Sequence, residues 1–175
     1  RLNGPSGRAL DEKFLKPLSL TRGDVWLCDL LPYSRVNENQ KKAIDNYYTQ
    51  DLIRNHNLTP ATIPVFDKKE LNSPSRREEI LHELEDSKAD TLIPLGDLPI
   101  YWFLRFFDKR YLRLAQFGKT PDSYGKVNPI NINGKSYKVI PLCHPRQADR
   151  LGSSDSKWNS LHNQWIRKLA EEKIN

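Results

Sequence analysis

Apolar residues recur along the chain with two different periods, and each period predicts a type of element. In residues 6–18, Leu10, Phe14, Leu15 and Leu18 recur at helical spacing behind Ser6 and Gly7, which predicts an N-capped amphipathic helix that ends at Pro17. Residues 25–31, with the sequence VWLCDLL, form a dense apolar run between a turn at residues 21–24 and Pro32. Such a run predicts a strand that is buried on both faces of a parallel sheet.

The middle of the chain predicts helices that are separated by extended segments. Helical patterns cover residues 41–57 and 73–88, with Pro74 in the first turn of the second helix and an extended piece at residues 61–66 between them. The stretch ADTLIPLGD, residues 89–97, is typical of a strand, a turn and a helix start. It leads into residues 98–107, which are apolar nearly all round, so we expect this helix to be buried.

The last third of the chain predicts a polar loop over residues 109–128, a hairpin and a final helix. Asn133 and Gly134 separate the runs NPINI and KSYKVIPLC, and this pair is typical of a tight hairpin turn. Residues 155–173 carry Trp158, Leu161 and Trp165 at helical spacing, which predicts a capped helix packed on the core. Strands that alternate with helices predict one α/β domain over residues 1–175, with three layers, α/β/α, around a central, mostly parallel sheet.

Composition narrows the classes of function. The 175 residues include 28 Lys and Arg against 22 Asp and Glu, a net charge of +6, which favours polyanionic partners such as nucleic acid. No apolar run approaches the ~20 residues of a membrane span, and no basic and apolar leader is present, so we expect a cytoplasmic monomer without a membrane role. Cys28 and Cys143 are too few for a disulfide framework or a four-thiolate metal site, so we expect both to pack in the sheet. The chain opens at Arg1 and contains no Met, so we also expect residues before Arg1.

Two predicted strands end in a polar side chain that follows a cysteine, Asp29 in the first and His144 in the second. Because loops at the carboxyl ends of parallel strands build the binding crevice of such folds, we expect the two side chains to converge on one cavity. Simpler interpretations stay open. A strand-end histidine can serve only to bind a backbone carbonyl, and Asp29 can cap a turn or pair with Arg35.

The segments that carry these residues resemble the uracil-DNA glycosylase superfamily. They are VWLCDLLPYSR, ADTLIPLGD and VIPLCHPRQADRLG, together with the preceding SGRALDEKFLKPLSLTRGDVW. In that family one buried strand ends in an Asn that reads the target base, and the last strand ends in His-Pro. The resemblance spans most of the chain and implies DNA repair, by hydrolysis of the N-glycosidic bond of an extruded base and without a cofactor or metal. It also implies that the family's Gly-rich first motif precedes Arg1.

By the same resemblance, His144 hydrogen-bonds the O2 atom of the departing pyrimidine and stabilises its negative charge, and Asp29 occupies the base-reading position. Pro145 is implied to fix the exit of the strand. The loop beyond the strand is implied to contact DNA through Pro145, Arg146, Gln147, Arg150, Leu151, Ser153 and Ser154.

The chain departs from the family pattern at two positions. An Asn amide both accepts from uracil N3–H and donates to O4, whereas the ionised Asp29 only accepts, so we expect uracil to be disfavoured against a base with an exocyclic amine. A protonated Asp29 would still mimic Asn. Tyr33 stands where the iron–sulfur branch of the family has a cysteine, so no cluster is expected.

The remaining candidates have weaker patterns. His56, His82 and His162 lack metal-like spacing and are expected at the surface. The aromatic run in residues 101–107 suits either base stacking or the core, and its helical context favours the core. Three functions follow: a DNA glycosylase, a nucleic-acid-binding module of the same fold that has lost hydrolysis, or a doubly wound domain that binds a small phosphorylated ligand in the same crevice.

Overall fold

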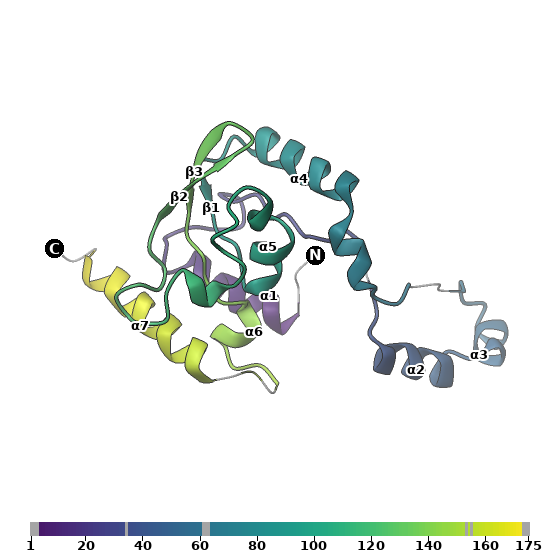
Figure 1. The fold of residues 1–175 in the computed structure, drawn as a ribbon. Helices are drawn as coiled ribbons and strands as arrows, with labels where there is room; N and C mark the ends of the chain where they lie inside the picture. The colour runs from purple at the N-terminus through teal and green to yellow at the C-terminus, as the bar shows by residue number, and fades with distance from the viewer. Residues whose placement is uncertain (1–3, 34, 61–63, 153, 155, 173–175) are drawn as a thin grey trace. The chain divides into compact units, whose positions relative to one another are not determined.

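The computed structural model describes residues 4–33, 35–60, 64–152, 154 and 156–172, and Figure 1 labels their elements. The chain divides into two compact units. The larger unit comprises Arg1–Leu27 and Glu79–Asn175, and the smaller unit comprises Cys28–Glu78. The boundary falls inside one helix, α4, which spans Pro74–Ser87 as the proline in its first turn predicted. That all 175 residues act as one domain stays a prediction.

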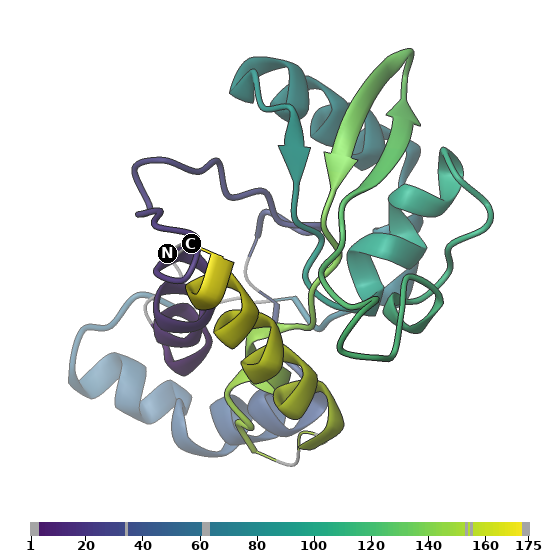
Figure 2. The same cartoon turned by 90° about the vertical axis from the view of Figure 1, so that its left-hand side faces the viewer.

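The larger unit contains a small mixed sheet with the strand order β1-β3-β2 (Figure 2). Strand β1, Thr91–Leu92, runs parallel to β3, Lys135–Val139, whereas β2, Asn128–Ile132, pairs with β3 in the antiparallel direction. The α/β class is therefore confirmed as helices with a mixed sheet. Among the described residues the longest pairing is the antiparallel hairpin, so this sheet is not mostly parallel.

The hairpin forms where the sequence predicted it. Asn133 and Gly134 have φ values of 49° and 86°, the left-handed conformation that a two-residue hairpin turn requires. The Asn131 side chain accepts a hydrogen bond from the Gly134 N–H at 2.9 Å. Tyr137 and Val139 of β3 are buried and alternate with exposed residues, so one face of the hairpin is turned to the core.

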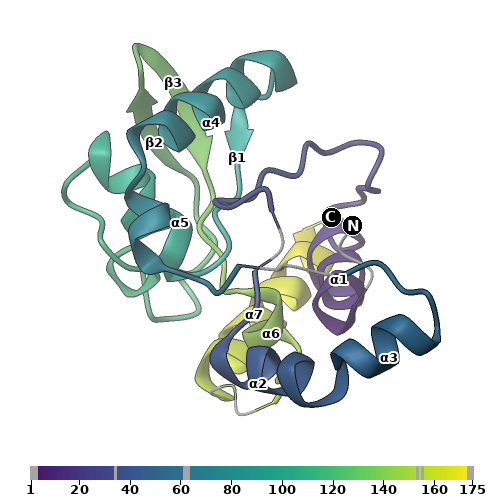
Figure 3. The same ribbon diagram turned by 90° about the vertical axis from the view of Figure 1, so that its right-hand side faces the viewer.

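Helices α1, α6 and α7 lie together in the larger unit (Figure 3). Helix α1, Pro5–Leu10, continues into the π-helical turn η1, Asp11–Leu15, and α7 spans Ser156–Glu172. Leu10, Phe14 and Trp165 are buried, as their helical spacing predicted. The N-cap of α1 is Gly4 rather than Ser6, because Pro5 takes the first helical position, where its missing N–H is not needed.

The segment from residue 98 to residue 107 forms a shorter and more exposed structure than predicted. Helix α5, Asp97–Trp102, ends early and is followed by the 3-10 turn η3, Leu104–Phe106; a further turn, η4, spans Leu114–Gln116 in the loop beyond. Leu98, Tyr101 and Phe106 are 54%, 37% and 38% exposed. The prediction of burial all round was wrong, because only one side of the segment is packed on the core.

Residues 25–31 form no strand, which corrects the prediction for VWLCDLL. Trp26 and Cys28 are exposed, so Cys28 does not pack in a sheet. A strand needs a partner that satisfies its backbone groups. In the smaller unit, two backbone groups of this segment are bound by a side chain instead. The guanidinium of the buried Arg76 donates to the carbonyl oxygens of Asp29 and Leu30.

The smaller unit also replaces one predicted helix, over residues 41–57, with two. Helix α2 spans Glu38–Tyr47 and α3 spans Gln50–Asn55. The Thr49 hydroxyl accepts from the Leu52 N–H at 3.3 Å, so it caps a new helix and interrupts the long pattern. The unit also contains the turn η2, Lys68–Asn72, and a parallel bridge between Val36 and Val65; residues 61–63 of the predicted extended segment lie outside the described part of the chain.

Candidate functional site

His144 is the N-cap of helix α6, Pro145–Ala148, and follows the last residue of β3, Val139, by five positions rather than ending the strand as predicted. Its backbone N–H donates to Gln147 Oε1 at 3.1 Å, and its side-chain Nδ1 accepts from the Arg146 backbone N–H at 3.1 Å. These two bonds form a capping box in which the imidazole takes the role usually played by a hydroxyl or carboxylate. Pro145 is buried at the first helical position. The sequence His-Pro-Arg-Gln therefore holds the imidazole at the helix start.

The capping contact also assigns the protons of the ring. A neutral imidazole carries one proton, and Nδ1 is an acceptor here, so the proton lies on Nε2. A donor at Nε2 is what stabilises negative charge that develops on a leaving group. The local structure of α6 thus leaves Nε2–H as the hydrogen-bond donor of the His144 ring.

His144 lines an open cleft of about 410 Å³ in the larger unit. The other walls are residues 95–98, Arg146, Gln147 and Ser154. The Leu95–Leu142 bridge and a 2.8 Å hydrogen bond from the Gly96 N–H to the Leu142 carbonyl bring the turn after β1 against the end of β3. The strand-turn-helix segment at residues 89–97 and the His-Pro segment, which both carry the family resemblance, therefore meet.

Gly96 is a residue of this site that the sequence analysis did not single out. Its φ of 86° favours glycine, and a Cβ built on it would lie 3.1 Å from His144 Cβ. A side chain at this position would press on the Cβ and backbone of His144, at the wall of the cleft. The sequence feature that could have identified Gly96 is its position between an apolar predicted strand and the start of a predicted helix.

The predicted DNA-contact residues are distributed over two hollows. Arg146, Gln147 and Ser154 line the cleft with His144, and the Ser154 hydroxyl donates to the Leu151 carbonyl at 2.7 Å. Leu151 instead lines a second pocket, of about 350 Å³. Arg150 is exposed with a positive φ of 52°, and Ser153 lies outside the residues that the structure describes.

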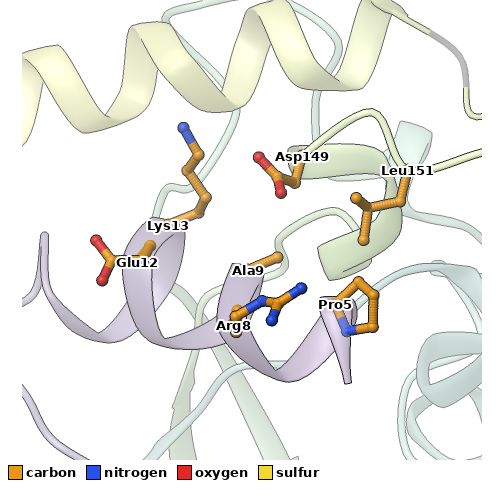
Figure 4. A pocket seen from close by; sticks show the side chains of 7 residues that line it. All are labelled: Pro5, Arg8, Ala9, Glu12, Lys13, Asp149 and Leu151. Atoms are coloured by element: carbon orange, nitrogen blue, oxygen red, sulfur yellow. The ribbon is translucent and has the colours of Figure 1, made fainter. Parts of the chain in front are cut away.

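The second pocket lies between α1 with η1 and the chain that follows α6 (Figure 4). Its charged side chains are Arg8 and Lys13, which are cationic, and Glu12 and Asp149, which are anionic. The charges of the two signs are equal in number, so the pocket has no net preference for a phosphate.

Asp29 belongs to the smaller unit, whereas His144 and all residues that line its cleft belong to the larger one. That Asp29 and His144 converge on one cavity therefore stays a prediction. Asp29 is exposed, and its backbone carbonyl accepts from Arg76. Arg35, the other partner considered for Asp29, donates to Glu70 at 2.9 Å, and this contact holds the pKa of Glu70 below its ordinary value.

A network of buried hydrogen bonds supports the segment between β3 and α6 that carries His144. The Cys143 backbone N–H donates to Tyr124 Oη at 2.9 Å, and Tyr124 Oη lies 2.8 Å from His162 Nδ1. His162 Nε2 in turn lies 2.9 Å from the Lys13 carbonyl oxygen. The residue next to His144 is thereby tied to α7 and to η1.

Burial determines which groups of this hydrogen-bond network carry a proton. It lowers the pKa of His162 to about 4 and raises the pKa of Tyr124 above its ordinary value, so the imidazole is neutral and the phenol keeps its proton. Tyr124 therefore donates to Nδ1, and Nε2–H donates to the Lys13 carbonyl. Burial also raises the pKa of the Cys143 thiol to about 11. Cys143 is fully buried, as predicted for a packing residue, but it lies beyond the end of β3 rather than in the sheet.

The prediction that His162 lies at the surface was wrong, because its side chain is fully buried. The ring packs on Phe14 at 4.3 Å and on Trp165 at 5.1 Å, measured between ring centroids. A signal was present in the sequence: His162 follows Trp158 by four residues and precedes Trp165 by three, which places it on the apolar face of the helix.

Neither a metal site nor a membrane span is found in the described part of the chain. There, no three or more His, Cys, Asp or Glu side chains are grouped so that they could hold a metal ion. The helices of the same residues are too short or too polar to cross a bilayer. In comparisons with known proteins, no family model matches this chain, and no curated protein matches it either.

Proposed function

We propose that this chain is a uracil-DNA glycosylase-like domain that receives an extruded base of DNA in the cleft beside His144 and promotes release of that base. The observation that carries the proposal is the setting of His144, whose Nδ1 accepts from the Arg146 N–H, so that its ring proton lies on Nε2, and whose side chain lines an open cleft. Residues 95–98, at the end of the strand-turn-helix segment of the family resemblance and the start of α5, line the same cleft. A three-layer arrangement around a mostly parallel sheet belongs to the same proposal.

The chemistry follows from the charge that develops as the base leaves. When the bond between the sugar C1′ and the base nitrogen breaks, its electron pair moves into the base and the sugar becomes oxocarbenium-like. Water then adds at C1′ and loses a proton to solvent, and the base anion takes up a proton from solvent. A hydrogen bond from His144 Nε2 to the O2 atom of a pyrimidine stabilises this negative charge, and one such donor is typically worth about 3 kcal/mol in the barrier. Arg146 brings a positive charge to the same cleft, which suits the phosphates that flank the extruded nucleotide.

Asp29 is proposed to select the base. An ionised carboxylate accepts from an exocyclic amine and repels the O4 atom of uracil, so we expect release of cytosine derivatives to be favoured over release of uracil. The test is a panel of single-stranded oligonucleotides that carry uracil, a cytosine derivative or hypoxanthine, assayed with the protein and with Asp29→Asn. Fast and selective uracil release by the unaltered protein would rule out this role for Asp29.

His144→Asn is the sharpest test of the proposed site. Asn is a good N-cap residue, so the variant keeps an acceptor for the Arg146 N–H and preserves α6 while it removes the imidazole donor. We expect base release to fall by about a hundredfold or more while DNA affinity changes little. An equal rate in the variant and the unaltered protein would rule out an electrophilic role for His144.

The second candidate is a module of the same fold that binds DNA without hydrolysis. The observation that favours it concerns Asp97, the only carboxylate among the described residues that line the cleft. Its Oδ1 accepts from the Leu114 N–H at 2.8 Å, a structural role that competes with the activation of water. DNA binding without any base release would support this candidate, whereas binding of small phosphorylated ligands with little dependence on salt would favour a nucleotide-binding domain.

A further inference from the structure

One side of α5 and η3 presents aromatic side chains outside the core. We call it the α5 aromatic face; it consists of Leu98, Tyr101, Trp102, Arg105 and Phe106. Ile100, Phe103 and Leu104, from the same segment, are buried and provide the packing that anchors it. The exposed side chains are therefore held on a fixed support rather than on a mobile loop.

Arg105 lies over this face. Its Cζ atom is 3.9 Å from the ring centroid of Tyr101, 5.2 Å from that of Trp102 and 5.1 Å from that of Phe106. A guanidinium that stacks on aromatic rings orients them and adds a positive charge to an apolar surface. Aromatic rings with an adjacent cation match a ligand that is both flat and anionic, which is the chemistry of unstacked bases on a phosphate backbone.

The face begins at the cleft that contains His144. Leu98 lines that cleft and, in α5, precedes Tyr101 by three residues and Trp102 by four, so these side chains lie on one side of the helix. A DNA strand that leaves the cleft past Leu98 therefore runs towards Tyr101 and Trp102.

The same pairing of rings with a guanidinium recurs in the following loop. Tyr111 and Phe117 stack with their ring centroids 3.7 Å apart, and Arg110 Cζ lies 5.3 Å from the Tyr111 centroid. Asp108 pairs with Arg110 at 2.6 Å and offsets part of its charge. Lys109, which lies between them, is exposed and adds a further positive charge.

We propose that the α5 aromatic face binds single-stranded DNA, with the unpaired bases next to the cleft stacked on Tyr101 and Phe106. The ligand is a single strand because a base presents its flat face only when it is unstacked from its neighbours. The route of the DNA from the His144 cleft to this face rests on the proposed function. The affinity of the α5 aromatic face for single-stranded DNA without a modified base does not.

The first experiment measures binding of a fluorescein-labelled 20-nucleotide thymidine strand, without any modified base, by fluorescence anisotropy. Replacing Tyr101 and Phe106 together with Ala is expected to weaken binding by about tenfold or more, because stacking is lost at two positions. Tyr101→Phe keeps the ring and should bind within about twofold of the unaltered protein. Tyr47→Ala is the matched control, since Tyr47 is 80% exposed in α2 and lies outside the face.

A second experiment measures base stacking directly and begins with the unaltered protein. A strand that contains 2-aminopurine loses fluorescence when that base stacks on an aromatic ring, so we expect quenching when the unaltered protein is added. Arg105→Ala should reduce both the quenching and the affinity, while Arg105→Lys restores the charge but not the planar stack. Absence of quenching at saturating protein would contradict the proposal.

The outcomes separate this inference from the proposed function. Loss of plain-strand binding in the Tyr101/Phe106 variant supports the inference even if the unaltered protein releases no base, in which case only the proposed function fails. The inference is overturned if this variant and the unaltered protein bind unmodified single-stranded DNA equally well. A face that binds another protein instead of DNA would give this result. The proposed function would survive that result if His144→Asn still abolished base release.

Discussion

The Tyr124 hydroxyl and the His162 imidazole form a buried hydrogen bond of 2.8 Å that joins the loop before β2 to helix α7. The same hydroxyl accepts from the Cys143 N–H, one residue before His144. Tyr124 thus connects the support of the candidate site with the core of the larger unit. Each group in this hydrogen-bond network is both buried and hydrogen-bonded. The removal of any one of them therefore leaves a buried polar group without its hydrogen-bond partner.

Protonation of His162 is expected to destabilise the folded protein. Burial lowers its pKa from 6.5 to about 4, so the unfolded chain binds the proton more readily between these values. The stability that His162 contributes is therefore fully present above pH 6.5 and is lost as the pH falls towards 4. Between pH 7 and pH 5 the free energy of unfolding should fall by about 2 kcal/mol on this account. Urea unfolding followed by tryptophan fluorescence measures it, and His162→Gln should show a smaller dependence on pH; an equal dependence would contradict the assignment.

Tyr124→Phe removes one oxygen atom that serves two buried partners. His162 Nδ1 and the Cys143 N–H both lose their contact, so we expect the free energy of unfolding to fall by about 2 to 4 kcal/mol. Tyr101→Phe provides the control, because it removes a hydroxyl from an exposed tyrosine and should change stability by less than about 0.5 kcal/mol. Chemical denaturation of both variants measures the difference, and a loss that is no larger in Tyr124→Phe would show that the network is not stabilising.

Gly96→Ala is expected to disturb the His144 cleft in addition to straining the backbone. Gly96 and Gly134 both have a φ of 86°, but a Cβ on Gly96 meets His144 at 3.1 Å, whereas a Cβ on Gly134 meets open space. Both variants should lose about 1 to 2 kcal/mol of stability from the strained backbone. Only Gly96→Ala should also weaken DNA binding or base release, measured at a temperature where both variants are folded. Equal binding and activity in the two variants would place the function elsewhere.

The two cysteines should differ sharply in reactivity. Cys28 is exposed, whereas Cys143 is buried and burial raises its pKa to about 11, so little thiolate forms there at pH 8. Ellman's reagent should therefore titrate one thiol rapidly in the folded protein and two after denaturation in urea. Cys28→Ser should remove the rapid phase, and a rapid phase that survives this substitution would mean that Cys143 is accessible.

The features that the sequence determined by itself are those that depend on near neighbours. The left-handed preference of Asn133 and Gly134 produced the hairpin turn, and Pro74 marked the start of α4. The helical spacing of Leu10 and Phe14 identified the buried side of α1 and η1. Each of these signals acts within a few residues, so no distant contact was needed to interpret it.

The features that only the tertiary structure decided depend on partners far away in the chain. The apolar run at residues 25–31 forms no strand, and Arg76, 47 positions from Asp29, donates to the carbonyl groups of Asp29 and Leu30. The burial of His162 is set by Tyr124 and by the Lys13 carbonyl, which is 149 positions away. Local pattern defines which residues can be buried or paired, but burial and pairing are interactions between surfaces. Which surface covers a given residue is therefore decided only when the whole chain has folded. The same holds for which side of α5 stays exposed.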